Sequence, residues 1–218
     1  MPSTIPAYAG RHEGTFTPIG GVEGYTTTRE EGRCGRLGED LAGVEDLRTW
    51  LTAHGIRCET WGRDGTKSVR SLWNEIAAGE TRLSPDPPMR EVAVVSVLIE
   101  AGGRRLTEVR QLMADGTVRE RNAWPSEKLL PGETPVAAAL RCLVEELRVD
   151  ARDVTVAAEP LSTTVEQLDS PSYPGLPTRY TLHTVAATVP DLPSTAFTTE
   201  EAPGTGEAAV RTHYWEWH

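Results

Sequence analysis

Residues 125–149 read PSEKLLPGETPVAAALRCLVEELRV, and this stretch decides the fold. Its second half has the features of a helix, because Thr134 can cap the N-terminus and Pro135 suits the first turn. The apolar residues that follow recur on one helical face: Val136, Leu140, Leu143 and Leu147. The pattern predicts a single helix over residues 135–148, entered from a tight Pro-Gly loop.

Two adjacent carboxylates lie away from this leucine face. Cys142, Glu145 and Glu146 are spaced i, i+3 and i+4, so we expect them to share the opposite face and to line a cleft. Such a pair suits Mg²⁺, which prefers a few carboxylates together with waters and phosphate oxygens. The alternative is a solvated acidic helix face, and a bare Glu-Glu pair by itself favours that alternative.

The whole stretch resembles the Nudix box, whose pattern is G-x5-E-x7-R-E-U-x-E-E-x-G-U, with U an aliphatic residue. The spacing fits residues 127–149 without a gap, and the matching residues are Glu133, Arg141, Leu143, Glu145, Glu146 and Val149. Three positions depart from the pattern. Glu127 and Arg148 stand where the box has glycine, and Cys142 replaces the Glu after the Arg. The box is therefore degenerate.

The resemblance implies a role for each matching residue. It implies that Glu145 and Glu146 are catalytic residues that hold Mg²⁺ or Mn²⁺, helped by the backbone carbonyl of Glu127. It also groups Arg141 with the catalytic residues, and it implies that Arg141 braces the loop through a salt bridge or shared hydrogen bonds with Glu133.

Cys142 is the departure with the largest chemical consequence. In the Nudix family the Glu at this position often binds the catalytic metal and can help to activate water. A thiol is a poor ligand for Mg²⁺, which wants oxygen. We therefore expect catalysis by the usual route to be weakened or lost.

Further candidates for the site lie mostly outside the box. A compensating acid could come from Glu166, Glu200 or Glu201. The candidates for substrate contact are Arg110, Arg119, Arg121, Lys128, Tyr173 and Arg179. For each arginine the alternative is a solvated strand residue, and for Tyr173 it is a buried residue in a turn.

The flanking sequence predicts an α/β fold with a mixed sheet. Strand-like segments at 91–100, 104–112 and 117–124 precede the box, and others at 154–167, 179–189 and 211–218 follow it. The resemblance implies a Nudix-like α/β/α sandwich over residues 89–218. Residues 44–88 read as a small α/β extension, with helices near 46–54 and 68–78, a strand at 56–62 and a Pro-rich linker at 84–89. Residues 1–43 form a Gly/Thr-rich N-terminal arm.

Composition and charge exclude several classes of protein. The 32 acidic and 22 basic residues give a net charge of −10, which disfavours a nucleic-acid binder. No apolar run approaches the length of a membrane span, and the N-terminus lacks the pattern of a secretory signal. The three cysteines are far apart, so a cytoplasmic setting is expected. Only two basic residues, Lys67 and Lys128, are lysines, which GC-rich coding explains most simply.

Two functions from different classes remain open. The first is a metal-dependent Nudix-like hydrolase acting on a diphosphate linkage in a nucleoside-diphosphate-X type small molecule. The second is a catalytically impaired Nudix-like module that binds a nucleotide or a protein partner. Thiol chemistry at Cys142 is disfavoured, because Glu145 and Glu146 would raise the pKa of the thiol. The sequence leaves the substrate and the oligomeric state open.

Overall fold

The computed structural model describes residues 41–63, 65–201 and 209–218, so the predicted arm lies almost wholly outside the described residues. The helices are α1 (Val44–Ala53), α2 (Val69–Ala77) and α3 (Pro135–Leu147), and a 3₁₀ turn spans Ala151–Asp153. The strands are β1 (Arg82–Pro85), β2 (Pro88–Ala101), β3 (Arg104–Met113), β4 (Val118–Ala123), β5 (Ser126–Lys128), β6 (Thr155–Val156), β7 (Ser162–Asp169), β8 (Pro177–Thr188), β9 (Phe197–Glu200) and β10 (Val210–Trp217). None of the helices in these ranges is long and apolar enough to span a membrane.

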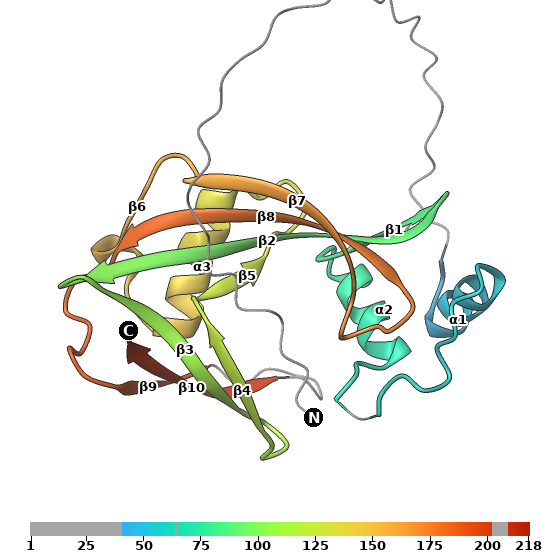
Figure 1. Ribbon diagram of the computed structural model, residues 1–218, viewed down its shortest axis with the longest axis horizontal. Helices are drawn as coiled ribbons and strands as arrows, with labels where there is room; N and C mark the ends of the chain where they lie inside the picture. The colour runs from blue at the N-terminus through green and yellow to red at the C-terminus, as the bar shows by residue number, and fades with distance from the viewer. Residues whose placement is uncertain (1–40, 64, 202–208) are drawn as a thin grey trace, which may run out of the picture.

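The sheet is mixed and divides into two halves. In the first half β2 pairs in parallel with β8 and antiparallel with β1 and β5, and β8 also pairs with β6 and β7. In the second half β3 pairs with β4 and β10, and β10 pairs with β9. The halves join at the turn between β2 and β3, where the pairing is limited to Glu100↔Arg105 and Ala101↔Arg104 (Figure 1). The predicted α/β class with a mixed sheet is confirmed, and the arrangement is consistent with the expected sandwich.

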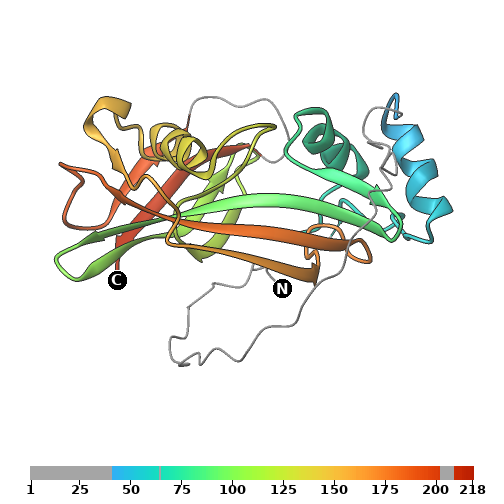
Figure 2. The same cartoon turned by 90° about the horizontal axis from the view of Figure 1, so that it is seen from above.

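Helix α3 packs into the space between the two halves (Figure 1). Its buried residues share one core with Val95, Val97 and Ile99 of β2, Val185 of β8 and Trp215 of β10. Figure 2 shows α3 and α2 on the same side of the long β2–β8 pair. This packing presents the box loop and the first turns of α3 at the edge of β5.

The ends of α3 follow local sequence rules. The Thr134 hydroxyl accepts a hydrogen bond from the Ala137 amide at 3.2 Å, and Pro135 occupies the first turn, as predicted. The helix ends at Leu147, one residue before the predicted end, and Arg148 takes the left-handed conformation with φ 59°. Glycine adopts this conformation without strain, which explains why the Nudix box has glycine at this position.

We therefore expect Arg148→Gly to stabilise the protein. A residue with a Cβ costs about 1 kcal/mol in the left-handed region, and Arg148 is exposed, so little packing is lost. Urea denaturation should show a free energy of unfolding higher by about 0.5–1 kcal/mol. An Arg152→Gly variant, at an exposed position outside the left-handed region, is the control and should show no gain. A stability equal to or below wild type in Arg148→Gly would contradict this assignment of strain.

The N-terminal extension departs from its predicted layout in two places. Residues 56–62 are not a strand, because Cys58 and Trp61 enter the core three residues apart through a turn in which the Trp61 amide binds the Cys58 carbonyl at 3.2 Å. Residues 84–89 are not a linker either. Pro85 and Pro88 face each other at the closed end of the β1–β2 hairpin, where no ladder hydrogen bond is required of them.

The extension has its own core, but part of that core comes from the rest of the chain. Leu47, Leu51 and Leu72 of its helices pack with Tyr173 and Leu176, which lie between β7 and β8. The Trp61 indole also donates a hydrogen bond to the Pro174 carbonyl at 3.1 Å. We propose that the boundary near residue 88 separates two structural parts that do not fold independently.

Candidate functional site

The loop before α3 is held to the helix by a forked ion pair, as the sequence predicted. Arg141 donates from Nε to Glu133 Oε1 and from Nη2 to Glu133 Oε2, both at 3.0 Å. The same Nη2 donates to the Lys128 carbonyl at 2.8 Å. Glu133 Oε2 accepts from the Leu130 amide at 2.9 Å, so one Glu-Arg pair closes the loop on both sides. These bonds to Arg141 lower the pKa of Glu133 and raise the pKa of Arg141.

Arg141 also contacts two other acids of the box. Its Nη1 lies 3.4 Å from Glu127 Oε2 and 3.5 Å from Glu145 Oε2. Burial raises the pKa of Glu127, while Arg141 and the Lys128 amide act in the opposite direction. A single guanidinium therefore lies among three carboxylates, and it contacts both metal-ligand candidates, Glu127 and Glu145.

We expect Arg141→Lys to destabilise the protein by about 1–3 kcal/mol, because an ammonium cannot bind both Glu133 oxygens and the Lys128 carbonyl in the fixed fork. Urea denaturation at pH 7 measures the loss. The matched control is Arg179→Lys, which alters the half-exposed pair with Glu91 (2.9 Å) and should cost at most about 0.5 kcal/mol. Equal costs in the two variants would show that the fork contributes nothing beyond an ordinary surface pair.

Cys142 does not share an open face with Glu145, and this part of the prediction was wrong. Cys142 is 0% exposed and lies in the core cluster, whereas the Glu145 side chain is 48% exposed. Glu146 is 9% exposed and falls on the buried side with Cys142. The helix turns its Ala138, Cys142 and Glu146 side inward because the two sheet halves pack on that side. Burial and Glu146 raise the pKa of the Cys142 thiol well above its ordinary value, so this thiol is inert.

Two polar residues that the sequence did not single out, Glu108 and His213, act on the pKa of Glu146 through their charges. Glu108 of β3 and His213 of β10 are almost fully buried, and the His213 Nδ1 lies 2.6 Å from Glu108 Oε1. Arg121 Nε donates to Glu108 Oε2 at 2.8 Å. The sequence could have indicated their burial. Glu108 lies two residues after Leu106, and His213 two residues before Trp215, so each shares the inward face of its strand with a large apolar residue.

The pKa values in this cluster depart from their ordinary range. Burial raises the pKa of Glu146 to about 8, and the charge of Glu108 adds to the effect. Burial alone would lower the pKa of His213, but its contacts with Glu108 and Glu201 outweigh burial and raise it to about 9. Glu146 Oε2 is buried without a hydrogen-bond partner among the described residues.

We expect stability to fall as pH rises from about 6 to about 9. Folding raises the pKa of both Glu146 and His213. Between its unfolded and its folded pKa, each group therefore keeps its proton in the folded protein but loses it in the unfolded chain, so stability falls as pH rises. The window runs from 4.5 to about 8 for Glu146 and from 6.5 to about 9 for His213. Urea denaturation across this range should show a loss of up to roughly 6 kcal/mol, with the two groups contributing about equally, and Glu146→Gln should flatten the part below pH 8. A stability that rises with pH would contradict these protonation states.

The box acids fit a divalent metal poorly in this arrangement. Mg²⁺ prefers several oxygen ligands, but Glu127 and Glu145 lie beside Arg141, whereas Glu146 is buried on the side of α3 that carries Cys142. The main chain of Glu127 lies in the β5–β2 ladder opposite Val95. Within residues 41–63, 65–201 and 209–218, no group of three or more His, Cys, Asp or Glu side chains is arranged to hold a metal ion. We therefore derive no chemical step through a metal.

The three candidates for a compensating acid are placed differently. Glu166 lies on β7 opposite Tyr180, on the outer strand beside β8. Glu200 is exposed at the end of β9. Glu201 alone of the three reaches the buried cluster, with its Oε2 3.4 Å from His213 Nε2.

The candidates for substrate contact are dispersed and mostly engaged. Arg110 lies over the Tyr214 ring at 4.3 Å, Arg119 donates to Gln111, and Arg121 binds Glu108. Lys128 and Tyr173 both bind Glu75. Tyr173 is fully buried, so the turn alternative describes it, and direct substrate contact by its ring is excluded in this arrangement.

A cavity of about 400 Å³ lies beside the box loop. It is bounded by Leu129–Glu133, by residues 79–82 of the extension, by residues 91–93 of β2 and by Arg179 and Thr181 of β8. Arg179 is the one substrate-contact candidate that lines it, and Arg82 adds a second guanidinium. Neither Glu145 nor Glu146 lines this cavity, contrary to the expectation of a cleft at the acidic helix face.

Comparison with known proteins gives weak likenesses. No family model matches the chain, and no curated protein matches it. Among solved structures, the E. coli ORF135 protein is 22% identical, with 59% of this chain and 74% of that chain covered and a TM-score of 0.34. A C. elegans Ap4A hydrolase in a binary complex is 16% identical (58% and 77% covered, TM-score 0.31), and a NUDIX hydrolase from Nitrosomonas europaea is 19% identical (56% and 72%, TM-score 0.33).

Likenesses with TM-scores this low carry no argument about this chain. The description of the chain as Nudix-like rests on its own residues. Positions 127–149 follow the box spacing, Thr134 caps the helix at the expected place, and Glu133 and Arg141 form the expected fork. On these grounds the chain has a Nudix-like fold with a degenerate box.

Proposed function

We propose that the chain binds a small molecule with a diphosphate linkage, of the nucleoside-diphosphate-X type, beside its degenerate Nudix box, and that hydrolysis there is weak or lost. The cavity next to the box loop supports the binding, because Arg82 and Arg179 line it at the edge of a rigid sheet. Glu80, Glu91 and Glu133 line it as well, and Arg179 is paired with Glu91 at 2.9 Å, so an anionic ligand would have to replace Glu91 as the partner of Arg179. Nucleic acid remains a disfavoured partner, since the net charge is −10.

The observation that carries the loss of hydrolysis is the place of Cys142, which is buried in the core and supplies no oxygen ligand where the Nudix box has Glu. Arg141, which the intact box also has, lies 3.4 Å from Glu127 and 3.5 Å from Glu145. The buried thiols of Cys58 and Cys142 are free, which supports the cytoplasm as the proposed setting.

Metal-dependent hydrolysis is the second candidate, and one observation favours it. Glu127 brings a carboxylate to a position where the Nudix box has glycine, and its charge acts on both Glu146 and Cys142. This carboxylate would replace the one lost at Cys142 if a substrate with Mg²⁺ or Mn²⁺ drew Arg141 away from it.

A screen of purified protein separates the two candidates. The compounds are nucleotide sugars, dinucleotides, nucleoside triphosphates and prenyl diphosphates, each with Mg²⁺ or Mn²⁺, with phosphate release and calorimetric binding as the readouts. Binding without turnover is the expected result. Turnover that is lost in Glu127→Gln and in Glu145→Gln, but kept in the surface control Glu100→Gln, would establish the hydrolase instead. Neither binding nor turnover with any compound would overturn the proposed function.

A further inference from the structure

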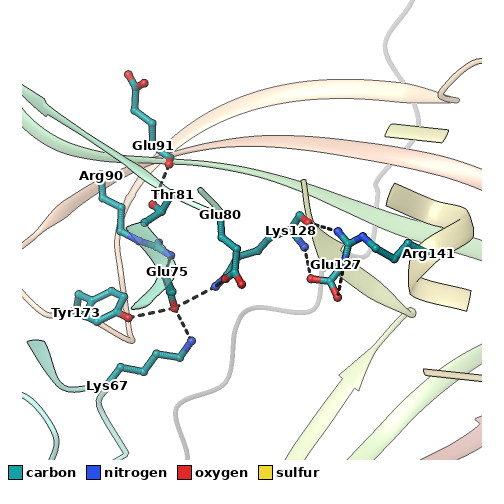
Figure 3. A network of polar contacts seen from close by, with 10 residues as sticks. All are labelled: Lys67, Glu75, Glu80, Thr81, Arg90, Glu91, Glu127, Lys128, Arg141 and Tyr173. Carbon is teal, nitrogen blue, oxygen red and sulfur yellow. Dashed lines mark hydrogen bonds and ion pairs between the residues drawn. The ribbon is translucent and has the colours of Figure 1, made fainter. Parts of the chain in front are cut away.

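Glu75 of α2 is a buried hub at the junction of the extension and the box (Figure 3). Its side chain is 7% exposed. Its Oε1 lies 2.7 Å from Lys67 Nζ and 3.0 Å from Lys128 Nζ, and it accepts from the Tyr173 hydroxyl at 3.1 Å. Its Oε2 accepts from Arg90 Nη2 at 2.7 Å. Donors from four separate segments of the chain thus converge on one carboxylate.

The two lysines in this hub are the only lysines of the 218-residue chain. Coding bias explains why lysine is rare, but it does not explain why both lysines bind the same oxygen. A compact ammonium group allows this, because two ammonium heads and a hydroxyl can surround one oxygen, whereas planar guanidinium groups need more room. Burial lowers the pKa of Lys67, and the cations hold the pKa of Glu75 well below its usual range despite burial.

Lys128 connects this hub to the box. Its ammonium binds Glu75 and also Glu80 Oε2, at 2.7 Å, while its backbone carbonyl accepts from Arg141. Figure 3 shows the resulting series of contacts from Glu75 through Lys128 to Arg141 and Glu127. The extension thus holds the side chain of Lys128, and Arg141 holds its backbone carbonyl.

A second contact brings the same two segments together. Gly79, directly after α2, packs so closely on the box loop that a Cβ there would lie 2.4 Å from Pro131 Cγ. Gly79 also has φ +74°, which a residue with a side chain rarely adopts. The C-terminal end of α2 is therefore fitted against the loop that precedes α3.

We propose that Glu75, together with Lys67 and Lys128, is a positioning group that fixes the box loop, residues 129–133, so that the extension completes the site. The part of this proposal that concerns ligand binding rests on the proposed function; the part that concerns loop position does not. Without the Glu75–Lys128 contact the loop keeps the Glu133–Arg141 fork and the packing of Pro131 on Gly79, but loses its ionic anchor to Glu75 of α2. The amides of Leu130 and Glu133, which close the loop through Glu133 Oε2 and the Leu130 carbonyl, should then open more often.

Amide hydrogen exchange on the full chain tests the loop directly. The variants are Glu75→Gln, which removes the central charge, and Lys128→Met, which keeps the stem and leaves Glu75 bound to Lys67 and Arg90. The control is Glu100→Gln, which removes an exposed pair with Arg105 (2.9 Å) in the same sheet. We expect exchange at Leu130 and Glu133 to rise at least about tenfold in both variants and to stay unchanged in the control, as expected of local opening.

Three further measurements make the test specific. Lysine labelled at the ammonium nitrogen gives two signals in this chain, and Glu75→Gln should shift both. Lys128→Arg should fail to restore the slow loop exchange, because a guanidinium does not fit beside Lys67. If a diphosphate compound from the screen binds, Lys128→Met should weaken its binding about tenfold.

The outcomes separate this proposal from the proposed function. Unchanged loop exchange in both Glu75→Gln and Lys128→Met would overturn the positioning role, whatever the ligand result. Loop amides whose opening free energy equals that of the β2–β8 pair in both variants would also overturn it, because that pattern indicates global unfolding and no separate local opening of the loop. If no compound binds the wild type but loop exchange responds as expected, the positioning role stands and the proposed function fails.

Discussion

Replacing Cys142 with glutamate, the residue that the Nudix box has at this position, is expected to destabilise the fold by about 3–5 kcal/mol at pH 7. The structure places Cys142 in the core at 0% exposure, beside Glu146, and Glu108 acts on both residues electrostatically. A third carboxylate there would be buried without a cation of its own. Urea denaturation at pH 7 measures the loss.

Cys142→Ala is the matched control for Cys142→Glu. It removes the thiol without adding charge, so we expect a loss of only about 1–2 kcal/mol from the small cavity. Denaturation with added Mg²⁺ or Mn²⁺ extends the test. Recovery of most of the lost stability by the metal, in Cys142→Glu alone, would show that a metal site has been restored and would contradict the poor fit described above.

Glu75→Gln is expected to cost about 3 kcal/mol of stability at pH 7, because it leaves Lys67, Arg90 and Lys128 without their shared carboxylate. The Arg90 side chain is 4% exposed, so water cannot replace the lost partner. The pKa of Glu75 is depressed in the folded state, so its contribution is present above the unfolded pKa near 4.5 and is lost as pH falls. The difference between wild type and Glu75→Gln should therefore shrink below about pH 4.5.

The control for Glu75→Gln is again Glu100→Gln, whose exposed pair with Arg105 should contribute at most about 0.5 kcal/mol at any pH. Urea denaturation of the three proteins between pH 3 and pH 7 makes the comparison. A Glu75→Gln cost as small as that of the control, or one that grows as pH falls, would show that the hub does not stabilise the junction in the way its geometry indicates.

The sequence by itself determined the local structure of the box. Thr134 and Pro135 set the start of α3, and the spacing placed Glu133, just before the helix, within reach of Arg141 eight residues later in the helix. These features depend on neighbours within about ten residues, so helical periodicity and capping rules were sufficient. Most strands around the box could be predicted in the same way, because alternating apolar residues indicate strands locally. The short strands β5 and β9 were not predicted, and the segment predicted as one strand over 154–167 contains the separate strands β6 and β7.

Only the tertiary structure decided which side of α3 is buried, and with it the character of the site. The leucine stripe indicated one face, but the two sheet halves cover the side that includes Cys142 and Glu146, because Trp215 and the β2 valines pack there. The sequence could not predict the cluster around Glu75 either. The residues that bind Glu75 come from segments up to 98 positions away in the sequence: Lys67, Arg90, Lys128 and Tyr173. Burial and charge pairing depend on such distant contacts, whereas helix and turn formation depend on near neighbours.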